Sequence, residues 1–188
     1  HCVTGVQTCA LPILRIACRQ DRNPYLLLFI HGGSIIMVLK EKERTVIEDL
    51  QTQEKCCVEK YAKYAEQAKD PELKKLFETL KSKEQEHYDS LSKVLSGTVP
   101  ECNCNDSDGR SYEPKATYNA MSDSEDKKND AFLATDCIGT EKLVSGTYNN
   151  EVFAFGDSSL RKLLADIQVE EQNHAEMLYK YKVANAMA

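Results

Sequence analysis

The sequence Glu84-Gln85-Glu86-His87 returns 87 residues later, with one change, as Glu171-Gln172-Asn173-His174. Thirty residues before each copy stands another glutamate, Glu54 and Glu141 respectively. An ungapped alignment of the two stretches superposes further pairs: Lys55 with Lys142, Tyr61 with Tyr148, Asp70 with Asp157, Leu73 with Leu160, and Leu76 with Leu163. Agreement at one fixed offset indicates an internal duplication, and repeats of this kind report architecture.

Around the first copy, apolar residues recur at alternating steps of three and four, which is typical of one face of a helix. One stripe is Ile47, Leu50, Glu54, Cys57, Tyr61, Tyr64 and Ala68, and the next is Leu73, Leu76, Leu80, Glu84, His87, Leu91 and Val94. Asp70-Pro71 separates them, because proline disfavours helix for the residue before it and suits the first turn of the next helix. A connection this short predicts an antiparallel hairpin.

The second copy repeats this pattern. Its stripes are Leu133, Cys137, Glu141, Val144, Tyr148, Val152 and Phe155, then Leu160, Leu163, Ile167, Glu171, His174, Leu178 and Tyr181. A long polar segment joins the two hairpins and leaves room for a short helical stretch. We therefore predict an all-α, ferritin-like four-helix bundle, with hairpin one at 40–96, a long crossover at 97–129 and hairpin two at 130–185.

Residues 1–36 lack this periodicity. The run from Val3 to Ile13 resembles the translation of a common sequencing-library adapter, so we interpret residues 1–36 as a disordered, non-native leader and Met37 as the native start of a single domain, 37–188. The alternative is a secretory signal. The apolar run Tyr25–Ile30 is short for one, and the charge before it is mixed.

The composition excludes some classes of partner. The formal net charge is −6, which argues against a nucleic-acid partner because an acidic surface repels phosphate. No apolar stretch approaches the length of a membrane-spanning helix, so no membrane partner is expected. Outside the leader the cysteines form an odd, irregular set, typical of a reducing compartment: Cys56, Cys57, Cys102, Cys104 and Cys137. Cys102 and Cys104 could bind metal, form cross-links between molecules, or simply lie in an exposed loop.

The two copies place six metal-ligating side chains on stripes that should be buried: Glu54, Glu84, His87, Glu141, Glu171 and His174. A buried carboxylate needs a counter-charge, a proton or a metal. No Lys or Arg shares the stripes near this level, whereas two divalent cations would balance four carboxylates. Carboxylate with imidazole suits iron or manganese, and one Glu from each of two helices with Glu-x-x-His from two others is a known dimetal arrangement in bundles.

A vestigial site with protonated or partly solvated glutamates remains the alternative. Tyr61 and Tyr148 lie two turns beyond Glu54 and Glu141. We expect them to serve either in packing or as hydrogen-bond donors to ligand carboxylates, although a radical role is also open. The buried cysteines are interpreted as small apolar fillers.

Two families resemble the chain. The ligand pattern, with Tyr61-Ala62 and Tyr64-Ala65 after Glu54, resembles the diiron domain of rubrerythrins, which reduce peroxide. The second half is similar to the spore coat protein F family of endospore-forming bacteria, through Thr140-Glu141-Lys142, Tyr148-Asn149, Leu160-Arg161, Glu170-Glu171-Gln172, His174 and the Tyr-rich last helix. Residues 1–188 contain no pair of Cys-x-x-Cys motifs, and the stretch Val183–Ala188 is not a Gly-aromatic tail, so the sequence departs from both families at these points.

These resemblances imply a structural protein of the spore coat that binds two iron or manganese ions, with other coat proteins or its own copies as partners. The alternative is a rubrerythrin-like diiron oxidoreductase that reduces peroxide or oxygen, and a cytoplasmic location is then possible. A third hypothesis is a metal-free bundle used for protein association. Whether the chain is an enzyme stays open at this point.

Overall fold

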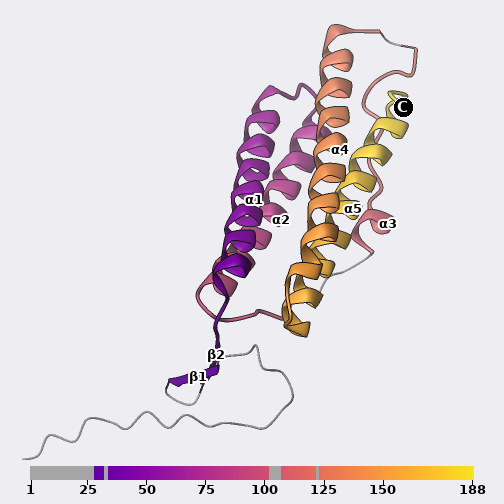
Figure 1. Cartoon of the computed structure of the whole chain (residues 1–188). Coiled ribbons are helices and arrows are strands. Elements are labelled where there is room, and N and C mark those ends of the chain that lie inside the picture. The colour runs from indigo at the N-terminus through magenta and orange to yellow at the C-terminus, as the bar shows by residue number, and fades with distance from the viewer. Residues whose placement is uncertain (1–27, 32–33, 102–106, 122) are drawn as a thin grey trace, which may run out of the picture. The chain divides into compact units, whose positions relative to one another are not determined.

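The computed structural model describes residues 28–31, 34–101, 107–121 and 123–188 (Figure 1). Within this described chain, four long helices form the bundle: α1 (Glu41–Gln67), α2 (Pro71–Leu95), α4 (Glu125–Glu151) and α5 (Ser158–Ala184). The short α3 (Asp108–Ser111) lies in the crossover, and the 3-10 turn η1 (Val152–Ala154) follows α4. The predicted all-α four-helix bundle is confirmed.

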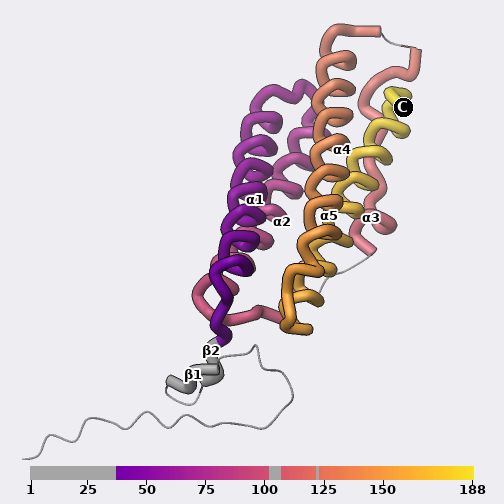
Figure 2. Tube along the Cα trace, in the orientation of Figure 1, coloured from indigo at the N-terminus to yellow at the C-terminus, as the bar shows by residue number. Residues whose placement is uncertain are grey.

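The helices pair as the duplication predicts. α1 packs along α2 and α4 packs along α5, and the two hairpins meet through contacts of α1 with α4 and of α2 with α5. Figure 2 follows the chain from the end of α2 through the crossover to the start of α4. This connection lets equivalent helices of the two hairpins face one another across a common core.

The turns of the two hairpins use the same cap. The Asp70 side chain accepts a hydrogen bond from Glu72 N at the start of α2, and the Asp157 side chain accepts one from Leu160 N at the start of α5. Aspartate at this position satisfies N–H groups that the helix leaves unpaired. Hairpin two adds η1 and the buried Phe155 before its cap, so its turn is longer than that of hairpin one.

α4 begins at Glu125, five residues before the start predicted for hairpin two. Ser124 caps the helix by accepting from Lys127 N at 3.3 Å. The buried Lys127 then donates from Nζ to the carbonyl oxygens of Asn119 and Ala120, at 3.1 and 3.2 Å. This first turn is polar throughout, and it is held by a cap and by contacts to the crossover, neither of which gives an apolar period.

The crossover docks on α5 through Gly109. Gly109 N donates to Asn173 Oδ1 at 2.9 Å, and Lys180 Nζ donates to the carbonyl oxygen of Gly109 at 2.6 Å. A β-carbon at position 109 would lie 2.7 Å from Glu176 Oε2 and 2.8 Å from Asn173 Oδ1. Only glycine allows this approach, which sets α3 beside the residues that flank His174.

Asp130, at the start of α4, holds the turn of hairpin one. This fully buried carboxylate accepts from the backbone N–H groups of Lys69 and Asp70, at 2.9 and 2.8 Å, and from Tyr118 Oη at 2.8 Å. Both hairpins and the crossover therefore meet at one satisfied polar group, which lowers the cost of its burial.

The described part of the leader forms a separate unit with a small antiparallel pair, β1 (Leu28–His31) and β2 (Ser34–Met37). Residues 1–27, 32–33, Cys102 and Cys104 lie outside the described residues, and the interpretation of 1–36 as non-native stays a prediction. Among the described helices, none combines the length and the apolar character that crossing a membrane requires.

Candidate metal centre

The six side chains singled out by the duplication converge in the middle of the bundle. α1 contributes Glu54 and α4 contributes Glu141, while α2 and α5 each contribute a Glu-x-x-His pair. The four glutamates are fully buried, and His87 and His174 are each 3 % exposed. Positions three apart on a helix share a face, so each pair points its carboxylate and imidazole the same way.

The six residues form two overlapping groups among the described residues. Glu54, Glu84, His87 and Glu171 make one, and Glu84, Glu141, Glu171 and His174 make the other, with the potential ligand atoms of each group within 4.8 Å of one another. Glu84 and Glu171 belong to both groups. Each group has four residues, and carboxylates with an imidazole are the ligands of a possible metal site.

The buried side-chain atoms that lack a hydrogen-bond partner indicate whether a metal ion fits this cluster. In the described part of the chain, nine buried side-chain atoms have no hydrogen-bond partner, and eight of them belong to these six residues. They are Glu54 Oε2, both carboxylate oxygens of Glu84 and of Glu171, Glu141 Oε2, and Nδ1 of His87 and of His174. Each group holds its own glutamate oxygen and imidazole nitrogen and shares the carboxylates of Glu84 and Glu171, so the orphaned atoms fit a metal site with oxygen and nitrogen ligands.

The imidazoles approach the carboxylates without hydrogen-bond geometry. His87 Nδ1 lies 3.0 Å from Glu171 Oε1, and His174 Nδ1 lies 3.0 Å from Glu84 Oε1. The two rings stack with their centroids 5.7 Å apart and an interplanar angle of 19°. Each histidine thus directs Nδ1 into the cluster and Nε2 away from it, which is an orientation in which Nδ1 can bind a metal.

Burial and neighbouring charges shift the pKa values of the carboxyl groups in opposite directions. Burial raises the pKa of Glu54 to about 7, and burial with the charges of Glu84 and Glu141 holds the pKa of Glu171 well above its usual range. Burial also acts to raise the pKa of Glu84, but His174 and His87 outweigh it and lower that pKa. Without a metal, the core therefore needs protons to balance its charges.

The imidazoles shift as well. Burial acts to lower the pKa of His87, but its carboxylate neighbours, Glu170 first, raise it well above the usual value. For His174, burial likewise acts to lower the pKa, and Glu84, Glu141 and Glu171 together raise it. A cationic imidazole is a substitute for metal charge, and metal binding would displace that proton.

Tyr61 and Tyr148 hold the outer oxygens of two glutamates, but across the bundle. Tyr61 Oη donates to Glu141 Oε1, and Tyr148 Oη donates to Glu54 Oε1. The position of each tyrosine after the glutamate of its own repeat suggested a carboxylate partner, and the structure supplies the glutamate of the opposite repeat. Burial raises the pKa of both phenols, so they remain proton donors. The remaining oxygen of each glutamate is thereby left for a ligand.

Glu170 is a site residue that the sequence pattern missed. Its Oε2 contacts Nε2 of His87, from the opposite hairpin. A carboxylate at this position keeps a proton on Nε2 and leaves Nδ1 facing the cluster. The duplication aligns Glu170 with Lys83, whose ammonium group cannot accept a hydrogen bond from a histidine. The repeat therefore did not predict this contact, and the only signal for it in the sequence was an acidic residue directly before Glu171.

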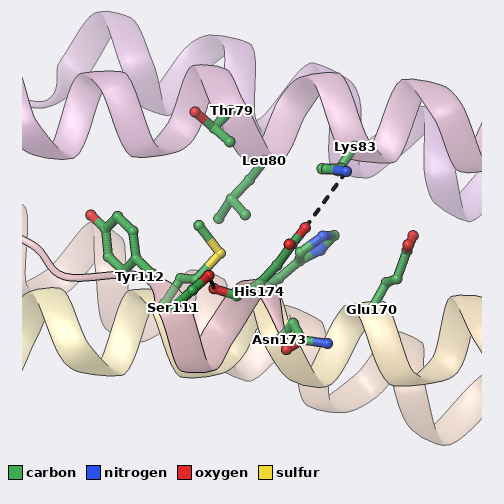
Figure 3. A pocket seen from close by; sticks show the side chains of 10 residues that line it. Thr79, Leu80, Lys83, Ser111, Tyr112, Glu170, Asn173 and His174 are labelled. Atoms are coloured by element: carbon green, nitrogen blue, oxygen red, sulfur yellow. Dashed lines mark hydrogen bonds and ion pairs between the residues drawn. The ribbon is translucent and has the colours of Figure 1, made fainter. Parts of the chain in front are cut away.

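A cavity of about 240 Å³ lies beside His174, and residues of the crossover form part of its wall. Figure 3 shows Leu80 and Lys83 from α2 opposite Asn173 and His174 from α5, with Tyr112 of the crossover at one end. Lys83 pairs with Asp108 of α3 at 3.7 Å, which ties α2 to the crossover across the cavity. Cys57 and Cys137 are buried free thiols, as expected for fillers.

The raised pKa of Glu54 predicts a pH-dependent stability of the metal-free protein. The folded pKa exceeds the ordinary value of 4.5, so this group's contribution is complete below pH 4.5 and is lost as the pH rises through about 7. Glu54→Gln fixes the neutral form. We expect the metal-free variant to match the wild type near pH 4.5 and to exceed its free energy of unfolding by roughly 3 kcal/mol near neutral pH, measured by urea denaturation.

The matched control is Glu66→Gln, at an exposed position on the same helix. The difference in free energy of unfolding between this variant and the wild type should stay the same across the pH range. An offset between Glu54→Gln and wild type that does not vary with pH would contradict the assignment.

Comparison with known families agrees with this geometry. Residues 129–187 match the Coat F domain, and residues 34–95 match Rubrerythrin. The first match covers hairpin two and the second covers hairpin one, so each family accounts for one half of the ligand set. No curated protein and no solved structure matches the chain. Hairpin two is thus similar to the Coat F domain and hairpin one to Rubrerythrin, and the second similarity agrees with a ferritin-like helical bundle.

Proposed function

We propose that the protein is a spore coat component whose bundle core binds two iron or manganese ions. The single observation behind the metal proposal is that eight orphaned donor atoms converge in two groups sharing Glu84 and Glu171. The coat location is supported by the Coat F match over hairpin two. Other coat proteins or further copies of the chain are the partners that this location implies.

The residues around the site have separable tasks in this proposal. Glu54, Glu84, His87 and Glu171 would hold one ion, and Glu84, Glu141, Glu171 and His174 would hold the other. Tyr61 and Tyr148 fix the carboxylates of Glu141 and Glu54 from outside. Glu170 holds the ring of His87, and the near-complete burial of the cluster excludes bulk water.

Metal content tests the core of the proposal. Protein loaded with manganese, or anaerobically with ferrous iron, should hold about two ions per chain by elemental analysis. The double variant Glu84→Gln with Glu171→Gln should lose both together, because these carboxylates belong to both groups. Glu86→Gln with Glu176→Gln places the same changes on α2 and α5 outside the cluster and should retain the metal. Metal-free wild type would contradict the proposal and favour a purely structural bundle.

Location is tested in the organism. We expect a tagged chain to appear in sporulating cells and to fractionate with the coat of purified spores. A co-expressed tagged protein without a coat domain serves as the control for carry-over. Detection only in vegetative cells, or absence from every spore fraction, would overturn the coat assignment.

A second candidate function is reduction of peroxide or oxygen by a diiron centre. The Rubrerythrin match over hairpin one and the complete ligand set in both hairpins favour it. Iron supplies the electrons that such a reduction requires. The protein's part would be to bind and orient the pair and to exclude water, and its buried Tyr61 and Tyr148 donors would keep the carboxylates in place.

Peroxide addition distinguishes the two candidates. Protein loaded anaerobically with ferrous iron should, if it is a reductase, oxidise about two ferrous ions per peroxide and form water, with a change in absorbance and in Mössbauer parameters. The Glu84→Gln with Glu171→Gln variant should show no more than the rate of free iron. Iron that stays ferrous in the wild-type protein would exclude this function while leaving the metal site intact.

A further inference from the structure

A second cavity lies between α4 and α5 and reaches the cluster from the side of hairpin two. It encloses about 320 Å³, and Glu141 and Glu171 form part of its wall. Ser145, Gly146 and Ala175 are among the other residues that line it. We call this cavity the α4–α5 opening. Small side chains form its wall beside two of the six ligand candidates.

The duplication explains why hairpin two is open here. Ser145 aligns with Val58 of hairpin one, and Ala175 aligns with Tyr88. Val58 and Tyr88 are half-buried, and both are larger than their counterparts. The same helix pair thus carries bulky side chains in one repeat and small ones in the other. Close packing leaves few spaces unless small residues create them, so the opening is a specific departure from the repeat.

The lining suits a hydrated cation. Gln168, Gln172 and Asn149 supply neutral amides at the wall, and the Ser145 hydroxyl donates to the backbone oxygen of Gln168 at 3.4 Å across the two helices. Six waters occupy about 180 Å³ in the liquid, so an ion with its first hydration shell fits the space. Amide and hydroxyl oxygens can replace those waters one at a time.

The carboxylates of the α4–α5 opening favour movement of a cation from the surface inward. The carboxylates of Glu141 and Glu171 lie at its inner end and are fully buried, so an ion moving inward exchanges neutral oxygens for anionic ones. Lys142, an exposed cation, also lines the opening. The net charge of −6 favours arrival of cations at the surface, while Lys142 opposes it locally.

We propose that divalent cations reach the buried cluster through the α4–α5 opening, and not through the equivalent face of hairpin one. This inference rests on the proposed metal centre. Passage past Ser145 and Gln168 is the controlling step, because their hydrogen bond joins the two helices at this cavity and the ligand carboxylates beyond it are closed to solvent.

The rate of cobalt(II) uptake by the metal-free full chain tests the route. Ser145→Val with Ala175→Tyr gives hairpin two the residues of hairpin one, and we expect stopped-flow absorbance to show uptake about tenfold slower with an unchanged final cobalt content. The mirror variant, Val58→Ser with Tyr88→Ala, should load no more slowly than the wild type. Equal rates for wild type and the filled variant would overturn the route.

Two single substitutions at the surface test the same route if the variant Ser145→Val with Ala175→Tyr does not fold. Lys142→Glu replaces the cation at the opening, and Lys55→Glu makes the same change at the aligned position of hairpin one. We expect Lys142→Glu to load about threefold faster, with the gain lost at high salt, and Lys55→Glu to load as the wild type does. Equal acceleration by both would overturn the route. A wild-type chain that takes up no cobalt would instead overturn the metal centre itself.

Discussion

The fold is organised around four carboxylates buried at one level of its core. Isolated, they would repel one another and destabilise any compact state. Each must therefore meet a proton, an imidazolium or a metal, and the bundle brings two histidines and two tyrosines to the same level. Four helices are needed because no single element can supply these groups from opposite sides. The leucine layers on either side exclude water and make the balance of charge a condition of folding.

The two hairpins carry the same ligand residues at aligned positions, but some of the residues around these ligands differ between the hairpins. Glu170 supports His87, whereas its counterpart Lys83 pairs with the crossover. Among the described residues, the crossover contacts α5 through α3 and forms part of the cavity beside His174. The two halves of the cluster therefore differ in the residues that surround them, although their histidines are equally buried.

The sequence was sufficient for the helices, their pairing and the convergence of the six ligand candidates, since the repeat ties those residues to one offset and one helical face. It was insufficient for contacts between hairpins. Neither the cross-bundle partners of Tyr61 and Tyr148 nor the contact of Glu170 with His87 follows from spacing within one chain segment, because each depends on how far one hairpin slides along the other. The start of α4 was also misplaced, since its first turn is set by the Ser124 cap and the Lys127 contacts.

The hydrogen bonds of Gly109 restrict how far α5 can move along its own axis. Asn173 accepts a hydrogen bond from the N–H of this glycine, and Lys180 donates one to its carbonyl oxygen. The two residues lie almost two turns apart on the helix. Sliding α5 by a single residue would release both at once and would carry His174 about 1.5 Å along the axis. The crossover thus fixes the last helix along its axis, and through the contacts of Gly109 it determines the height at which α5 places its imidazole in the core.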